Sequence, residues 1–190
     1  HVGDMDVLTL ARQLREAGVK APVVALAYDS QELSRFVRRR DVSDVDRFFL
    51  WQGDVRILLS IVNYVEDRLN VEHDTGTMGV QAIILVEDSI RFYSSYLPAI
   101  YAELTHHSQR LAPEGANLSQ KLLRAQARPK ILLSSTFEEA WQYFTAYEPN
   151  ILGVISDVEF PWGGQQRRDA GVEFAHKVRE RQPDVPIILQ

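Results

Sequence analysis

Short apolar runs alternate with amphipathic segments along most of the chain. Runs of mainly apolar residues predict buried strands at 22–27, 47–51, 82–86, 130–133, 151–156 and 186–189. Apolar positions three or four residues apart predict helices at 6–17, 30–39, about 55–70, from 89 onward, 136–147 and 169–181. The alternation of strands with helices predicts an α/β fold with a parallel sheet and right-handed crossovers.

Acidic residues directly follow two of the predicted strands. Glu87 and Asp88 come after the run at 82–86, and Asp157 comes after the run at 151–156. The carboxyl ends of parallel strands are where α/β sheets place their chemistry, although a turn or a helix N-cap explains a lone aspartate there equally well. If the two strands are neighbours, the three carboxylates converge, and their mutual repulsion calls for a cation. A set of oxygen ligands favours Mg²⁺.

Composition narrows the class of protein. The 190 residues suggest one domain or two small ones, and the net charge of −5 argues against nucleic acid as the main partner. The chain has no cysteine, which excludes a disulfide framework and a thiolate site. No apolar run approaches the ~20 residues of a membrane span, and no signal-peptide pattern follows His1. We therefore expect a soluble, cytoplasmic piece of a longer chain, with no membrane partner.

Two segments interrupt the alternation of strands and helices. Threonines and glycines at 73–80 predict a linker. The stretch between Asp88 and the strand at 130–133 is longer than one helix and its loops require. The additional residues predict a helical insertion at about 112–128, which is either a partner surface, a lid or a solvent-exposed helical segment. Pro98 falls inside the preceding helix and predicts a kink or a local break.

The residues around the acidic positions resemble a known family. Val-Glu-Asp at 86–88 follows one strand, and Asp-x-x-Phe-Pro at 157–161 follows a later one. This pattern resembles the receiver domain of bacterial response regulators, whose fold is a flavodoxin-like, three-layer α/β/α arrangement around a parallel sheet. In that family an acidic pair holds Mg²⁺ and a later aspartate accepts a phosphoryl group. The resemblance implies phosphorelay signalling, with a histidine kinase or a small phosphodonor as partner.

The resemblance assigns a role to each residue of the two motifs. Glu87 and Asp88 correspond to the acidic pair, and Asp157 corresponds to the phosphoacceptor, which is also a metal ligand. Glu159 would lend its backbone carbonyl to the Mg²⁺, and Pro161 matches the proline of the family's loop. The implied chemistry is sound, because a carboxylate is a competent nucleophile for phosphoryl transfer and Mg²⁺ neutralises charge on phosphate oxygens.

An internal similarity predicts two partial receiver-like units. At one constant offset, Ala11, Arg15, Glu16 and Pro22 recur as Ala175, Arg179, Glu180 and Pro186. Both sets lie in a predicted helix followed by a predicted strand. Residues 1–72 therefore look like the carboxyl-terminal part of a degenerate receiver. Residues 81–190 look like the amino-terminal part of a second one.

The sequence also departs from the receiver pattern. A receiver has Thr or Ser after its fourth strand and Lys after its fifth, whereas the first unit has Ala27 and Gln52 in those places. Phe160 stands where the family usually has Met. Two functions therefore remain open. The chain is either a phosphoacceptor region that regulates an attached enzyme or partner, or a non-phosphorylated pseudo-receiver scaffold for contacts between domains or proteins.

Four longer stretches of the sequence narrow the resemblance to one group of bacterial proteins. The residues at 3–6, 86–98, 128–133 and 153–161 are similar to the tandem receiver-like region of bacterial phosphoenolpyruvate synthase or pyruvate phosphate dikinase-like proteins. This implies a downstream phosphoenolpyruvate/pyruvate-binding domain in the same parent chain, with ATP-dependent phosphotransferase activity there. We identify no catalytic machinery of that kind at 1–190 itself. The incomplete units are expected to expose sheet edges, which favours homo-oligomers.

Overall fold

The computed structural model describes residues 7–29, 31, 33, 42–110 and 128–190. The predicted helix at 30–39 and the predicted insertion at about 112–128 lie almost entirely outside the described residues. The helices are α1 (Val7–Glu16), α3 (Arg56–Met78), α4 (Ile90–Arg110), α6 (Phe137–Tyr147) and α7 (Ala170–Arg181), with a short 3-10 helix η1 (Glu148–Asn150). The strands are β1 (Val24–Ala27), β2 (Arg47–Leu50), β3 (Ala82–Val86), β4 (Lys130–Ser134), β5 (Ile151–Ser156), β6 (Phe160–Trp162), β7 (Gln165–Arg167) and β8 (Ile187–Leu189).

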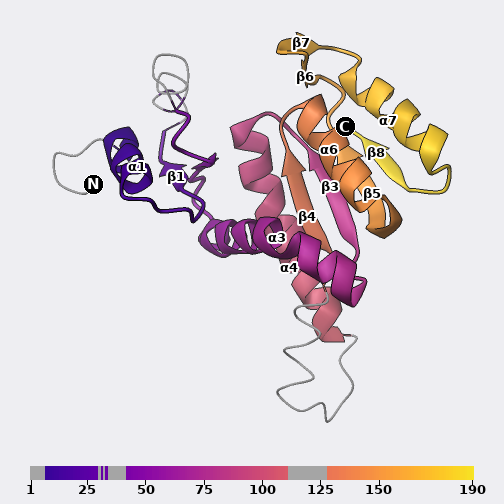
Figure 1. The fold of residues 1–190 in the computed structure, drawn as a ribbon, viewed down its shortest axis with the longest axis horizontal. Coiled ribbons are helices and arrows are strands. Elements are labelled where there is room, and N and C mark those ends of the chain that lie inside the picture. The colour runs from indigo at the N-terminus through magenta and orange to yellow at the C-terminus, as the bar shows by residue number, and fades with distance from the viewer. Residues whose placement is uncertain (1–6, 30, 32, 34–41, 111–127) are drawn as a thin grey trace.

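Within the described residues, the larger sheet is parallel and has four strands in the order β4-β3-β5-β8 (Figure 1). The strand that comes first in this part of the chain, β3, therefore lies between the second and the third. That order is compatible with a flavodoxin-like fold. The α/β class and the parallel sheet predicted from the sequence are confirmed. β1 and β2 form a separate, two-stranded parallel sheet.

Helices cover both faces of the larger sheet. Successive residues of a strand point to opposite faces, so Ile84 and Leu85 of β3 belong to two different apolar clusters. Ile84 packs in a cluster that contains the aromatic residues of α6 and α7, namely Phe137, Phe144 and Phe174. Leu85 packs in a cluster with Tyr93, Leu97 and Tyr101 of α4 and with Tyr64 of α3. Figure 1 shows these two helix pairs on either side of the sheet.

The smaller sheet is joined to the larger unit through the second of these clusters. Phe49 of β2 packs edge-on against Tyr64 and Tyr93, with ring centroids 5.6 and 5.5 Å away. The Tyr93 hydroxyl donates a hydrogen bond to the backbone carbonyl of Phe48 at 2.5 Å. Since Phe49 comes from the first predicted unit and Tyr93 from the second, the two units share one apolar core.

The predicted linker at 73–80 is helical over most of its length. α3 continues to Met78 and ends at Gly79, whose φ of 65° and N–H contacts to Asp74 O and Thr75 O form a left-handed C-cap. The Thr75 hydroxyl donates to a carbonyl of the preceding turn at 2.7 Å. Asp74 Oδ2 lies 2.8 Å from Lys130 Nζ. These contacts stabilise a helix that the weak helix propensity of Thr-Gly-Thr did not predict.

Of the kink or local break predicted at Pro98, the break is not present. α4 is continuous from Ile90 to Arg110 and contains Pro98. A proline removes one hydrogen bond from the interior of a helix. The buried side chains of Leu97 and Tyr101, on either side of it in sequence, keep α4 packed against the sheet. The apolar face of the helix therefore outweighs the missing hydrogen bond.

Candidate metal centre

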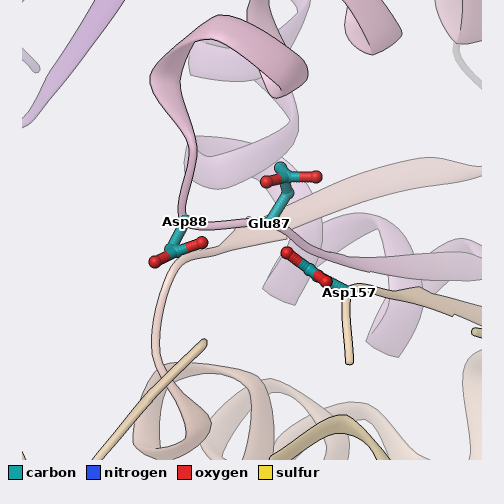
Figure 2. A group of neighbouring side chains, drawn as sticks. All are labelled: Glu87, Asp88 and Asp157. Atoms are coloured by element: carbon teal, nitrogen blue, oxygen red, sulfur yellow. The ribbon is translucent and has the colours of Figure 1, made fainter. Parts of the chain in front are cut away.

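The carboxyl ends of β3 and β5 bring the three predicted carboxylates together. Val86 and Ser156 are register partners, so the residues that follow them leave the sheet side by side. The ladder extends one step further, because the Asp157 N–H donates to Val86 O at 2.9 Å. One carboxylate oxygen from each of Glu87, Asp88 and Asp157 lies within 4.8 Å of the others. Figure 2 shows Asp157 reaching from the end of β5 toward the two acidic residues after β3.

Glu87 is the most buried of the three carboxylates. Its side chain accepts hydrogen bonds from the Ser89 N–H at 3.0 Å and from Gln190 Nε2 at 3.4 Å. The pKa of Glu87 is raised to about 7, mainly by burial and in part by the charges of Asp157 and Asp88, while the hydrogen bond from Ser89 opposes the shift. Near neutral pH this carboxyl group is therefore partly protonated unless a cation is bound.

Asp88 and Asp157 are half-buried, and each accepts a hydrogen bond. Burial raises the pKa of Asp88, the negative charge of Asp157 adds to that effect, and a hydrogen bond from Gln166 acts against it. Asp157 Oδ1 accepts a hydrogen bond from the Glu159 N–H at 3.2 Å, which is a local turn of the kind that aspartates form. The predicted acceptor is thus held by the backbone two residues downstream.

The backbone carbonyl of Glu159 lies close to the carboxylates. Gln166 Nε2 donates to Glu159 O and to Asp88 Oδ2, at 3.2 Å in each case. A single nitrogen atom therefore connects this carbonyl to one of the three carboxylates. Gln166 was not predicted as a site residue, because nothing in its local sequence indicates that its side chain returns to the acidic residues.

A hairpin explains how Gln166 reaches the site. β6 and β7 pair antiparallel and are joined by Gly163 and Gly164, with φ values of 63° and 76°. Pro161, predicted to lie in a loop, lies instead in β6 opposite Gln166. Glycine tolerates positive φ without steric cost, and Gly-Gly between two short runs is a hairpin signal. That signal is present in the sequence at 163–164.

The first turn of α7 packs directly against the backbone that carries Asp157. The Gly171 N–H donates to Val158 O at 3.0 Å. A Cβ atom at Gly171 would lie 2.1 Å from the carbonyl oxygen of Asp157, and 2.8 Å from Val158 Cα. Since both neighbours are backbone atoms, only glycine permits this approach. The position of the Asp157 backbone therefore depends on Gly171.

The first unit also contacts the backbone of the site. Arg47 at the start of β2 donates to Ser135 Oγ at 2.7 Å and to Glu139 Oε1 at 2.9 Å. The Ser135 hydroxyl in turn donates to the carbonyl oxygen of Glu87 at 3.2 Å. Two side chains thus connect the smaller sheet to the strand end that presents the acidic pair.

The donor set suits a hard divalent cation. All the predicted ligand atoms are oxygens, three of them from carboxylates, and oxygen ligands are those that Mg²⁺ and Ca²⁺ prefer. Burial and neighbouring negative charge raise the pKa values of Glu87 and Asp88, so their charged forms lack full compensation from the protein alone. A cation would supply that compensation.

A comparison of this chain with family models, with curated proteins and with solved structures finds no match in any of the three. Function must therefore be argued from the site itself. Over the residues that the structure describes, no helix has both the length and the apolar character needed to cross a bilayer.

Proposed function

We propose that the chain carries a receiver-like phosphoacceptor site, in which Asp157 accepts a phosphoryl group and Mg²⁺ is held beside it. The ligands would be Glu87, Asp88 and Asp157, together with the backbone carbonyl of Glu159. The observation that carries the proposal is the gathering of three carboxylates at the ends of two neighbouring parallel strands. The strand order around them is compatible with the same assignment.

The proposed reaction is a direct transfer to a carboxylate. An Asp157 oxygen attacks the phosphorus of a small acyl phosphate, and the bond from phosphorus to the donor's oxygen breaks, leaving a free carboxylate on the donor. The product is an acyl phosphate on Asp157, and no proton is transferred. A bound Mg²⁺ would neutralise charge on the phosphoryl oxygens. The hydrogen bond from the Glu159 N–H would hold the nucleophile in position.

The first unit would have a packing role in this proposal. Gln52, which stands in place of the lysine expected of a receiver, donates to Arg91 O at 2.7 Å and to Ser95 Oγ at 2.9 Å, both on α4. Its side chain therefore binds the first turns of the helix that follows the acidic pair. Attachment of this region to a dikinase-type enzyme, with a phosphoenolpyruvate/pyruvate-binding domain downstream, is part of the same proposal.

Phosphorylation with a small acyl phosphate and Mg²⁺ tests the proposal. Intact-mass spectrometry of the chain should show one added phosphoryl group that is lost in base. Asp157→Asn should abolish the addition, whereas Asp184→Asn, a matched change at an exposed aspartate near the start of β8, should leave it unchanged. Calorimetric titration with Mg²⁺ reports on the metal site independently.

The alternative function is a pseudo-receiver scaffold that is not phosphorylated. The observation in its favour is that the first unit lacks the hydroxyl and ammonium groups of a receiver and contributes aromatic residues to a shared core. Mg²⁺ binding without phosphorylation of Asp157 would favour this scaffold. Phosphorylation that persists in Asp157→Asn would contradict the acceptor assignment.

A further inference from the structure

The β6–β7 hairpin places an amide side chain at the proposed cation site. Gln166 lies directly opposite Pro161, which is only four residues after Asp157. The hairpin turns back at Gly163 and Gly164, so its second strand returns toward the carboxyl end of the sheet. Figure 1 shows the hairpin near that end, beyond the tops of α6 and α7.

The Gln166 amide binds two of the proposed metal ligands. Its nitrogen donates to Asp88 Oδ2 and to Glu159 O, at 3.2 Å in both cases. A primary amide has two N–H donors, and both acceptors here are oxygens that carry no hydrogen. This orientation of the amide is therefore the one that satisfies the hydrogen bonds. The positive end of the amide dipole faces the oxygens that a cation would require.

The hairpin itself is held on α6 by contacts that do not involve Gln166. The Gly163 N–H donates to Glu138 Oε1 at 2.8 Å. The Trp162 ring stacks on Phe137 with centroids 4.2 Å apart, and the Arg167 guanidinium lies 4.2 Å from the centroid of Trp162. The Gln166 side chain is exposed. It can therefore rotate away from the acidic residues while the hairpin stays in place.

We propose that Gln166 acts as a gate for this site. In the ion-free protein its amide holds Asp88 and the Glu159 carbonyl, and the amide must move away when a divalent cation binds. The proposal rests on the cation site argued above and adds its regulation. Metal binding breaks two hydrogen bonds of Gln166, so removing those bonds beforehand strengthens metal binding. Because one acceptor is charged and the contact is exposed, we expect a gain of roughly three- to tenfold in affinity.

Titration with MgCl₂ alone, followed by calorimetry, tests the gate. Gln166→Met keeps the size of the side chain but has no donor, and it should bind Mg²⁺ roughly three- to tenfold more tightly than wild type. Gln165→Met makes the same change one residue earlier, opposite Trp162, and should match wild type. In wild type, the side-chain amide resonances of Gln166 should shift during the titration with the same dissociation constant as the heat signal.

The possible outcomes distinguish a failure of the proposed role of Gln166 from a failure of the cation site. Equal or weaker Mg²⁺ binding in Gln166→Met, with binding intact in wild type, overturns the gate and leaves the cation site standing. Amide resonances that do not respond to bound Mg²⁺ overturn it as well. Absence of Mg²⁺ binding in wild type and in both variants overturns the cation site, and the gate with it.

Discussion

The electrostatic cost of burying negative charge at this site falls mainly on Glu87. Only 1% of its surface is exposed, and carboxylate oxygens of Asp88 and Asp157 lie within 4.8 Å of one of its own. A buried carboxylate next to like charges is stable either as the neutral acid or beside a cation. The raised pKa of Glu87 is the direct expression of that constraint.

The first prediction concerns pH. The pKa of Glu87 is about 7 in the folded protein and 4.5 as its ordinary value. The folded state therefore binds this proton more tightly, so its contribution to stability is complete below about pH 4.5 and is lost as pH rises to about 7. Without metal, raising the pH from 5 to 8 should lower the free energy of unfolding by roughly 1–3 kcal/mol more in wild type than in Glu87→Gln. Urea unfolding measures the difference.

The exposed Glu180→Gln serves as the control, because it should leave the pH dependence of wild type unchanged. The same proton affects metal binding, since an ion must displace it. The affinity for Mg²⁺ should therefore fall by up to about tenfold per pH unit below pH 7. Identical pH profiles for wild type and Glu87→Gln would contradict the assignment of the raised pKa to this residue.

The second prediction compares two glycines. Gly171→Ala forces a Cβ onto the Asp157 carbonyl and should destabilise the fold by roughly 1–3 kcal/mol while weakening Mg²⁺ binding. Gly76 lies inside α3 with open space around it, so Gly76→Ala should stabilise the helix by roughly 0.5–1 kcal/mol. Thermal unfolding of both variants measures the contrast, and the same sign for the two changes would contradict it.

At the scale of elements, α3 is the helix that connects the two units. Its second half carries Asp67 and Asp74, which are buried beside the positive charges of Arg128 and Lys130 at the start of β4. Arg128 Nη2 lies 2.8 Å from Asp67 Oδ1, and Asp67 also accepts a hydrogen bond from the Tyr101 hydroxyl at 2.9 Å. This buried ionic cluster lies at the end of the sheet opposite to the acidic site.

The third prediction concerns that cluster. Lys130 is fully buried, and its Nζ lies 2.8 Å from Asp74 Oδ2. Lys130→Met leaves a buried carboxylate without its partner and should destabilise the protein by roughly 3–5 kcal/mol. The double variant with Asp74→Leu removes both charges and should recover part of that loss. Chemical denaturation measures both, with the exposed Lys20→Met as the neutral control.

At the scale of the whole molecule, the two predicted units behave as one packed body in the structure. Phe49 from β2 is buried between Tyr64 of α3 and Tyr93 of α4. Arg47 adds polar contacts to Ser135 and Glu139 beside the acidic site. Loss of the smaller sheet would therefore expose apolar surface of α4 and remove support from the site.

The fourth prediction is that the two units unfold together. Phe49→Ala should cost roughly 3–5 kcal/mol and should accelerate amide hydrogen exchange in α3 and α4 as well as in β2, because both helices lose packing against Phe49. Phe92→Ala, at an exposed position on α4, should do neither. Faster exchange confined to the smaller sheet would show that the units are independently stable.

Local sequence determined the identity of most elements and the place of the acidic residues. Apolar runs and three-to-four-residue spacings are properties of single segments, so β3, β5 and α6 were predicted near their observed positions. Parallel strands have their carboxyl ends at the same edge of the sheet. Glu87 and Asp157 therefore meet there because β3 and β5 are neighbours. The hydrogen bond that the Thr136 side chain accepts from the Glu139 N–H is likewise local, and Thr-x-x-Glu is a sequence signal for the start of a helix.

Only the tertiary structure decided three other features. α3 runs through Gly76 because Asp74 meets Lys130, more than fifty residues later in the chain. The Gln166 amide reaches Asp88 because the β6–β7 hairpin folds back on α6. Neither the Gln166–Asp88 contact nor the contact of Gly163 with Glu138 on α6 leaves a periodic signal in the sequence. The two units share a core because Phe49 of β2 packs against Tyr93 of α4. Each depends on residues far apart in the chain, whose free energy of contact no local pattern records.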